Sequence, residues 1–442
     1  MRKLFLPTLL TMVVLLLAAS CAAGAGSQGR VIREARRALN ATPPNLGEAR
    51  TLAAQVAEHP DHANDAAVWR LRGDIESATF DAELTRFIMG TTDLTVAQQT
   101  TKYNALANSF EFYVIADSLA QIPDERGRIR NPHRRDLAAT MRTHHMYFIN
   151  GGIFFSERDN PARAADLFQM FWDMPTLPMF EGSLEQFVID ETFQSIKYYA
   201  VLMALQAEQY TRAATMLQRI LDEPWIENEV FTENEVYELL AVTHQSMGNH
   251  EGFVAAIREG ATRFPENEFL VMNYMHELIT NEQTDQAFAF IERVVAANPA
   301  LTCELISVRG ALLAEQGNIE GAEAEFRRIL ELDPNCERAL EALARSIVIR
   351  AQDQRDVVFT LTNPTVYEVR AIDQLALVIY EEAVPLLENL DRLLQARSAP
   401  EHEQIAVLLL LRNVYFNLVM LGVDKTEKYN AIEARLPADF EE

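Results

Sequence analysis

Three prolines recur at an almost constant interval in the second half of the chain and divide it into units of similar length. Pro265, Pro299 and Pro334 are separated by 34 and 35 residues. Proline has no backbone N–H and cannot continue a helix, so each of these residues marks a helix end. A period of about 34 residues is typical of chains that stack pairs of helices. The spacing therefore predicts an all-α fold built from repeated helix pairs.

The clearest unit runs from Cys303 to Cys336 and contains two apolar helical faces separated by a Gly-Asn turn. Its apolar positions recur three or four residues apart, as one face of a helix requires; they are Ile306, Gly310, Leu313, Ala322, Phe326 and Ile329. This pattern resembles the tetratricopeptide repeat (TPR). The resemblance implies a right-handed superhelical solenoid of antiparallel helix pairs, which cross closely where small residues such as Gly310 and Ala322 meet.

Weaker copies of this unit extend the repeat in both directions, to about six or seven units in all. Residues 145–336 are predicted to be regular TPR units, and residues 31–144 to be degenerate N-terminal units with a looser helical pattern. Residues 337–442 are predicted to form a C-terminal helical cap. In this cap we expect a long helix over 374–396, which contains Pro385, and a buried helix over 404–421.

Three short segments near the C-terminus make the resemblance to TPR proteins more specific. They are Tyr380–Glu388 (YEEAVPLLE), Asn413–Leu418 (NVYFNL) and Thr426–Asn430 (TEKYN). Their order after the repeats resembles a group of envelope TPR proteins of the Bacteroidetes type. The resemblance implies a TPR protein of the cell envelope and brings no catalytic residue and no assigned biochemical role with it.

The N-terminal segment has the features of a secretory signal. Arg2 and Lys3 precede an apolar stretch, and the small residues of Ala18-Ala19-Ser20 precede Cys21. We predict that residues 1–20 are a signal peptide, that Cys21 is lipidated, and that residues 21–30 are a short linker. Cleavage by the ordinary signal peptidase is the alternative. Because Ala22 is not acidic, the expected location is the outer membrane, facing the periplasm or the cell surface.

The charge balance limits the possible partners. With 64 acidic and 39 basic residues the chain has a formal net charge of −25, which argues against nucleic acid and against adsorption to anionic membranes. We therefore expect envelope proteins or extended peptides as partners, and contact with the membrane only through the lipid anchor. The function predicted is that of a non-catalytic scaffold for protein–protein interactions. A solute- or glycan-binding helical lipoprotein is the alternative, although Trp69, Trp172 and Trp225 are widely scattered.

No sequence motif indicates catalysis, a cofactor or a metal site. There is no nucleophile elbow, phosphate-binding loop or zinc-ligand pattern. The neighbouring His144 and His145 point about 100° apart on a helix, so they are poor joint ligands for one ion. Cys303 and Cys336 lie one repeat apart. Because packed helices are spaced by about 10 Å, we expect two free and largely buried thiols.

Two groups of residues are candidate partner-binding sites. The first is a basic cluster in an acidic chain: Arg126, Arg128, Arg130, Arg134 and Arg135. It could dock an acidic partner or phosphate groups, or its charges could pair with nearby carboxylates in a solvated loop. The second group is expected on the concave face lined by first helices, where it would suit a basic or extended peptide, or would simply face solvent: Glu235, Glu238, Gln245, His276, Glu304 and Ser307.

The segment 176–191 lengthens one connection between helices. It carries the apolar residues Met179, Phe180 and Phe187. Long connections in compact proteins are often functional, so this one could form a lid or a contact site. The alternative is that it folds back on the neighbouring helices.

Overall fold

The computed structural model describes residues 25–90, 93–182 and 186–437, and within them every regular element is helical. The chain divides into two compact units, Met1–Asn249 and His250–Glu442. The α-helices of the first unit are α1 (Ala25–Leu39), α2 (Leu46–Ala57), α3 (Ala66–Met89), α4 (Val96–Ala120), α5 (Arg134–Ser156), α6 (Pro161–Asp173), α7 (Glu191–Gln206), α8 (Tyr210–Asp222) and α9 (Glu233–Ser246). Those of the second unit are α10 (His250–Arg263), α11 (Glu268–Thr280), α12 (Thr284–Ala297), α13 (Thr302–Glu315), α14 (Ile319–Leu332), α15 (Glu337–Asp356), α16 (Val366–Ala396), α17 (Glu401–Met420) and α18 (Thr426–Glu433).

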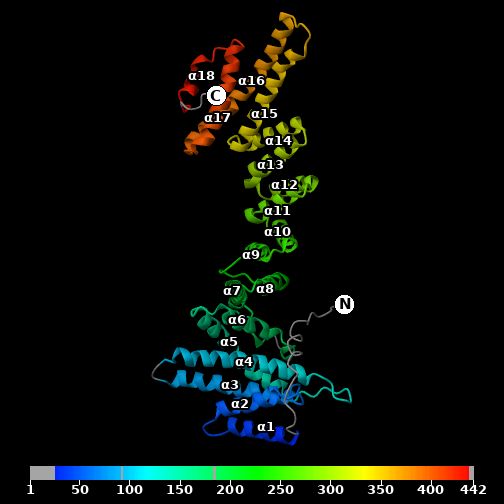
Figure 1. The fold of residues 1–442 in the computed structure, drawn as a ribbon, viewed down its shortest axis with the longest axis vertical. Coiled ribbons are helices and arrows are strands. Elements are labelled where there is room, and N and C mark those ends of the chain that lie inside the picture. The colour runs from blue at the N-terminus through cyan, green and yellow to red at the C-terminus, as the bar shows by residue number, and fades with distance from the viewer. Residues whose placement is uncertain (1–24, 91–92, 183–185, 438–442) are drawn as a thin grey trace. The chain divides into compact units, whose positions relative to one another are not determined.

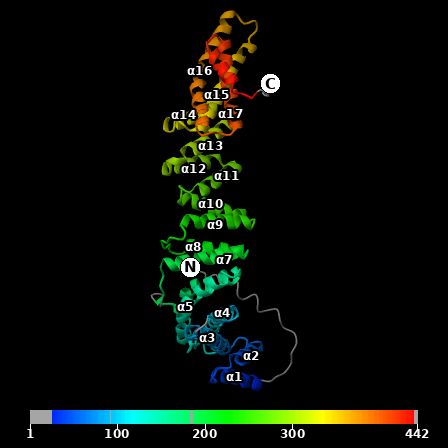
Figure 2. The ribbon, with the colours of Figure 1, turned by 90° about the vertical axis from the view of Figure 1, so that its left-hand side faces the viewer.

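Consecutive helices pack as antiparallel pairs, which confirms the predicted all-α solenoid of helix pairs. The pairs α3 with α4 and α5 with α6 are extensively packed in the first unit, as are α13 with α14 and α15 with α16 in the second. Figures 1 and 2 show this succession of helix pairs within each unit. The boundary between the units falls between α9 and α10, inside the range 145–336 that was predicted to consist of regular repeats.

The turn inside the clearest repeat shows why these residues form two helices. Gly317 has a φ of +78°, a left-handed conformation that glycine adopts at little cost and that ends α13. The side chain of Asn318 then accepts a hydrogen bond from the backbone N–H of Gly321 at 3.0 Å. This bond satisfies one of the free donors at the start of α14. The sequence Gly-Asn thus stops one helix and starts the next.

Helix pairs cross closely where a glycine meets an aromatic ring. A Cβ atom on Gly310 would lie 2.5 Å from the ring of Phe326. The same arrangement recurs in the first unit, where a Cβ on Gly152 would lie 2.3 Å from Phe168, and one on Gly73 would lie 2.5 Å from Tyr113. In these three pairs the glycine of the first helix leaves the space that an aromatic residue of the second helix fills.

The two cysteines form a disulfide, so the prediction of free thiols was wrong. Cys303 and Cys336 are bonded, with their Cα atoms 5.7 Å apart. The predicted separation of about 10 Å is the distance between helix axes. Cα atoms lie about 2.3 Å from their own axis, so residues that face each other across two packed helices are only about 5 Å apart. Cys303 in the first turn of α13 and Cys336 at the start of α15 face each other in this way.

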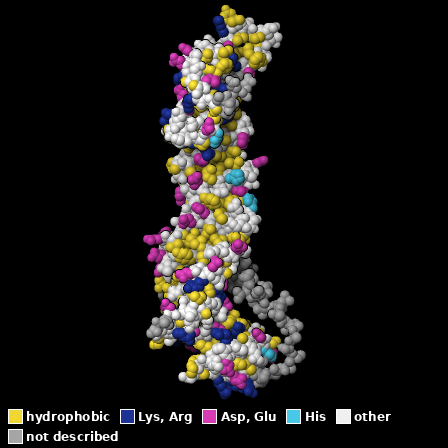
Figure 3. Space-filling view, turned by 60° about the vertical axis from the view of Figure 1, so that its left-hand side comes forward, with side chains coloured by type: hydrophobic (Ala, Val, Ile, Leu, Met, Phe, Trp, Pro, Cys, Tyr) yellow, Lys and Arg dark blue, Asp and Glu magenta, His cyan; other side chains and the backbone are white. Residues whose placement is uncertain are grey.

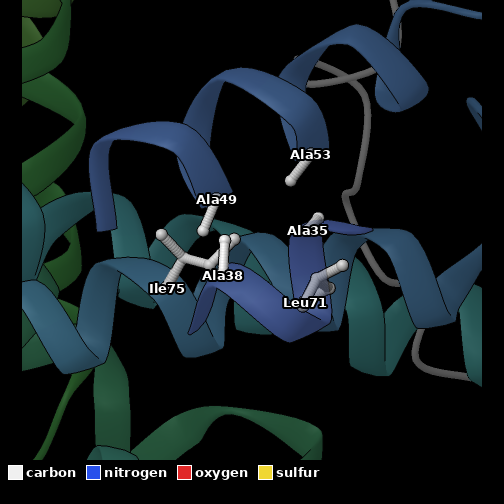
Figure 4. Close-up of a cluster of buried hydrophobic side chains, with 6 residues drawn as sticks. All are labelled: Ala35, Ala38, Ala49, Ala53, Leu71 and Ile75. Atoms are coloured by element: carbon white, nitrogen blue, oxygen red, sulfur yellow. The ribbon is translucent and has the colours of Figure 1, made fainter. Parts of the chain in front are cut away.

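Small residues also bring the first helices together. Ala35 and Ala38 of α1, Ala49 and Ala53 of α2, and Leu71 and Ile75 of α3 form one buried cluster, seen in Figure 4. Helix α1 begins at Ala25, inside the segment 21–30 that was predicted to be a linker. The predicted signal peptide, residues 1–20, and Cys21 lie outside the described residues.

The inserted segment folds back on the first unit, in agreement with the second interpretation above. Phe180 and Phe187 are buried, and their rings contact each other with centroids 4.9 Å apart. Phe187 also contacts His145, which stacks on Phe171. The segment is therefore part of the packing around α5 and α6.

One helix of the second unit, α17, is long and apolar enough to span a membrane by length and composition, the single such helix in the described parts of the chain. Its residues Val407, Leu411 and Val414 are buried, and the helix packs between α16 and α18. Glu401 and Glu403 lie in its first turn. The helix predicted to be buried in the C-terminal cap is therefore buried along one face, whereas Phe416 and Met420 are exposed. Pro385 lies inside α16, which continues unbroken to Ala396.

Candidate functional site

The residues predicted on the concave face fall into the two units, three in each. In the first unit, Glu235, Glu238 and Gln245 lie on α9. The carboxylate of Glu235 accepts hydrogen bonds from the backbone N–H and hydroxyl of Thr232 at 2.7 and 2.8 Å, so it caps the start of its own helix. Glu238 is half-buried, and Gln245 is exposed in the last turn. Of these three, Gln245 offers the freest side chain.

In the second unit, His276 lies on α11, and Glu304 and Ser307 lie on α13. His276 is exposed. Glu304 forms an ion pair with Arg338 of α15, with 2.6 Å between Oε1 and Nη2. Ser307 is buried, and its Oγ lies 3.9 Å from the Sγ of Cys336. Its prediction as a surface residue was wrong, because α15 packs against α13 and the start of α15 covers this position.

The basic cluster joins the end of α4 to the start of α5, and most of its arginines pair with carboxylates. Arg134 forms a bidentate pair with the buried Asp117, at 2.9 and 3.0 Å. Arg128 and Arg130 both lie beside Asp124, at 3.0 and 3.6 Å. Hydrogen bonds from the amide and guanidinium of Arg128 lower the pKa of Asp124. These contacts favour the interpretation as an internally paired loop for three of the five arginines.

The other two members of the cluster stay candidates for docking a partner. Arg126 and Arg135 are both exposed. Within the described residues, neither guanidinium forms an ion pair. Together they are the part of this loop whose positive charge is available to a partner.

The adjacent histidines of α5 are packing residues with separate partners. The Nε2 of His144 lies 3.0 Å from the Oδ1 of Asp81, and that of His145 lies 2.9 Å from the backbone carbonyl oxygen of Phe171. Burial lowers the pKa of His145. No group of three or more His, Cys, Asp or Glu side chains in the part of the chain that the structure describes could hold a metal ion.

A buried polar network links α6, α7 and α8. The Nζ of Lys197 lies 2.7 Å from Glu223, which also accepts hydrogen bonds from Arg219 at 2.7 Å and from the indole of Trp172 at 3.0 Å. Burial alone would raise the pKa of Glu223, but the hydrogen bonds and charges of Lys197 and Arg219 outweigh it and hold the pKa below its usual range. Each charged group faces an opposite charge, which is the condition for burying ions at tolerable cost. The network is therefore explained by the packing of α6, α7 and α8.

The tryptophans do not form a surface for stacking sugars. Trp172 is 1% exposed. Trp69 packs against Phe112 and Trp225 against Phe231, in different parts of the first unit. Figure 3 shows acidic, basic and hydrophobic side chains interspersed over the face in view.

Three hollows in the described parts of the chain are lined by none of the predicted site residues. One of about 510 Å³ lies at the start of α8 beside Met247, and one of about 390 Å³ lies beside Gln404 and Arg435. Another, of about 220 Å³, lies between α2, α3 and α4 and is lined by Arg72 and Asn108. Sequence reasoning missed these two residues because no motif joins them. They come from different helices of the least regular repeats.

Comparison with known families gives a match to the tetratricopeptide repeat over residues 307–336. A comparison with curated proteins finds no match. Among solved structures the chain is similar to the TPR domain of P58(IPK), at 10% identity over 92% of this chain and 99% of that one, with a TM-score of 0.23. It is also similar to yeast Tom70, at 10% identity over 93% and 95% of the two chains with a TM-score of 0.24. A monomeric IFIT1 mutant with Gppp-AAAA gives 11% identity over 81% and 80%, with a TM-score of 0.24.

Proposed function

We propose that this chain is a non-catalytic scaffold that binds envelope proteins or extended peptides. The observation that carries the proposal is the repeated helix pair, whose match to the tetratricopeptide repeat covers residues 307–336. Such repeats present extended surfaces along their first helices, which suit protein and peptide partners. On α11 of the second unit, the exposed His276 lies on a first helix of this kind.

A pull-down from envelope extract tests the scaffold. The full chain should retain a protein in stoichiometric amount, and His276→Glu should reduce its capture several-fold. His402→Glu is the matched control, because His402 is an exposed histidine in the first turn of α17 and should leave capture unchanged. Retention of a glycan or a small solute, with no protein, would count against the scaffold and for the alternative of a solute-binding lipoprotein.

We also propose that the chain is exported and anchored to the outer membrane through a lipid on Cys21. The signal features of residues 1–20 support export. The disulfide between Cys303 and Cys336 supports it independently, since disulfides persist in oxidising compartments such as the periplasm.

Metabolic labelling with a fatty-acid probe tests the anchor. The natural chain should take up the label and fractionate with the outer membrane, whereas Cys21→Ser should do neither. If both chains lack the label, Cys21 is not lipidated, and the signal is cleaved by the ordinary peptidase. A chain that stays in the cytoplasm would overturn export itself.

A further inference from the structure

The hollow between α2, α3 and α4 combines an apolar wall with charged side chains. Ala53, Ile75 and Phe112 form apolar parts of the lining. Its volume of about 220 Å³ is below the range of about 300–1,000 Å³ that is usual for drug-sized ligands. The hollow is therefore suited to a compound about the size of one amino-acid residue.

One charged pair on the wall is already satisfied. Arg50 donates from Nε to Glu76 at 2.6 Å and from Nη2 to the second carboxylate oxygen at 3.1 Å. The same Nη2 also donates to the hydroxyl of Thr79 at 3.0 Å. Glu76 is buried, so this pairing compensates its charge. Together Arg50 and Glu76 form a neutral part of the wall.

Arg72 lies four residues before Glu76 on the same helix, α3, and differs from Arg50 in its contacts. Its guanidinium carbon lies 3.9 Å from the ring centroid of Phe112 and 4.6 Å from that of Trp69. Stacking occupies the faces of the guanidinium but not the N–H groups on its edge, of which arginine has five. Within the described residues Arg72 forms no hydrogen bond and no ion pair. Burial lowers its pKa, but an arginine remains positively charged at neutral pH.

Asn108 supplies a second group without a partner. Its side chain lines the same hollow from α4 and forms no hydrogen bond within the described part of the chain. An amide offers two N–H donors and one carbonyl acceptor. The hollow thus contains a guanidinium that, within the described residues, interacts with the carboxylates of Glu76 and Glu58 without a hydrogen bond or close ion pair, and it has further donors beside an apolar wall.

We propose that this hollow binds a carboxylate carried on a short aliphatic stem. The planar fork of Arg72 matches the two oxygens of a carboxylate, and charge-assisted bonds of this kind are stronger than neutral ones. The amide of Asn108 provides a further donor, and Ile75 and Phe112 bury the stem. The carboxylate can belong to a free organic acid or to the last residue of a peptide.

The proposal is tested by titrating the full chain with N-acetyl-leucine and with N-acetyl-leucinamide, which differ only in the carboxylate. Binding is followed by calorimetry and by the fluorescence of Trp69, which lies against Arg72. Because the chain has 3 tryptophans, the fluorescence change must be assigned to one of them. Trp69→Phe should abolish the change if it comes from Trp69. We expect the acid to bind at least tenfold more tightly than the amide. N-acetyl-alanyl-leucine separates the two sources: binding as tight as that of N-acetyl-leucine indicates a peptide end, and loss of binding indicates a free acid.

Three variants complete the test. Arg72→Ala should abolish binding. Arg86→Ala should leave it unchanged, because Arg86 lies on the same helix but pairs with Glu83. Asn108→Asp keeps Arg72 in place and adds a negative charge, so it should weaken binding at least fivefold even if Arg72→Ala disturbs the packing.

The proposal fails if the amide binds as tightly as the acid, or if Arg72→Ala and Asn108→Asp both keep the natural affinity. It also fails if inorganic phosphate binds as tightly as N-acetyl-leucine, because the site would then accept any anion. The hollow lies in the first unit and does not involve His276, so its failure leaves the scaffold proposal standing.

Discussion

Replacing Gly310 with alanine tests the glycine–aromatic packing that brings α13 and α14 together. The new Cβ would lie 2.5, 2.7 and 3.0 Å from three ring atoms of Phe326. Ordinary contacts of this kind begin near 3.4 Å, so the ring or the helix must move by roughly 1 Å. Phe326 is 4% exposed, and overpacking a filled core costs about 1–3 kcal/mol. Alanine regains about 1 kcal/mol of helix propensity, which leaves a net loss of up to about 2 kcal/mol.

Denaturant unfolding of the full chain, followed by circular dichroism, measures this loss, and hydrogen exchange of α13 and α14 locates it. Gly47→Ala is the matched control. Gly47 is also helical, and a Cβ atom on it would have no other atom within 4 Å, so alanine there should stabilise by about 0.5–1 kcal/mol. The double variant with Gly310→Ala and Phe326→Leu should lose about 1 kcal/mol or more less unfolding free energy than the two single variants lose in sum. If Gly310→Ala stabilises the chain as Gly47→Ala does, the close crossing does not exist in solution.

Three further predictions concern the disulfide, a buried histidine and a buried ion pair. Reduction of Cys303–Cys336, which closes a loop across a sequence separation of 33, should cost about 2–4 kcal/mol; melting with and without dithiothreitol measures this, and a double serine variant should not respond to the reductant. Burial lowers the pKa of His145 below its ordinary value of 6.5, so the unfolded state binds the proton more readily. Stability should therefore be full above pH 6.5 and fall as the pH drops below it, by about 1.4 kcal/mol per unit of pKa shift. His145→Phe should remove this part of the pH dependence, and an unchanged slope in urea unfolding would refute the assignment. Arg134→Ala leaves Asp117 buried without its bidentate partner and should cost about 1–3 kcal/mol, whereas Arg135→Ala should change the urea midpoint little.

The sequence by itself determined the helix pairs. The recurrence of Pro265, Pro299 and Pro334 indicated their period, and Gly317-Asn318 indicated the position of one turn. Gly310 was identifiable as a site of close crossing from the sequence, because only a small residue allows two helix backbones to approach. These features depend only on neighbouring residues or on a regular spacing. They can therefore be recognised in the sequence even where single repeats are irregular.

Only the tertiary structure decided which side chains meet. The disulfide was missed because the distance between helix axes was taken for the distance between Cα atoms. Cα atoms on the facing sides of two packed helices lie much closer together than the axes do. Ser307 was placed at the surface because nothing in its own repeat shows that α15 covers it. Arg72 and Asn108 are ordinary polar residues in the sequence. Only the packing of α2, α3 and α4, which belong to the least regular repeats, brings them into one hollow. Residue spacing within a helix follows from backbone geometry, whereas contacts between helices depend on side chains far apart in the chain.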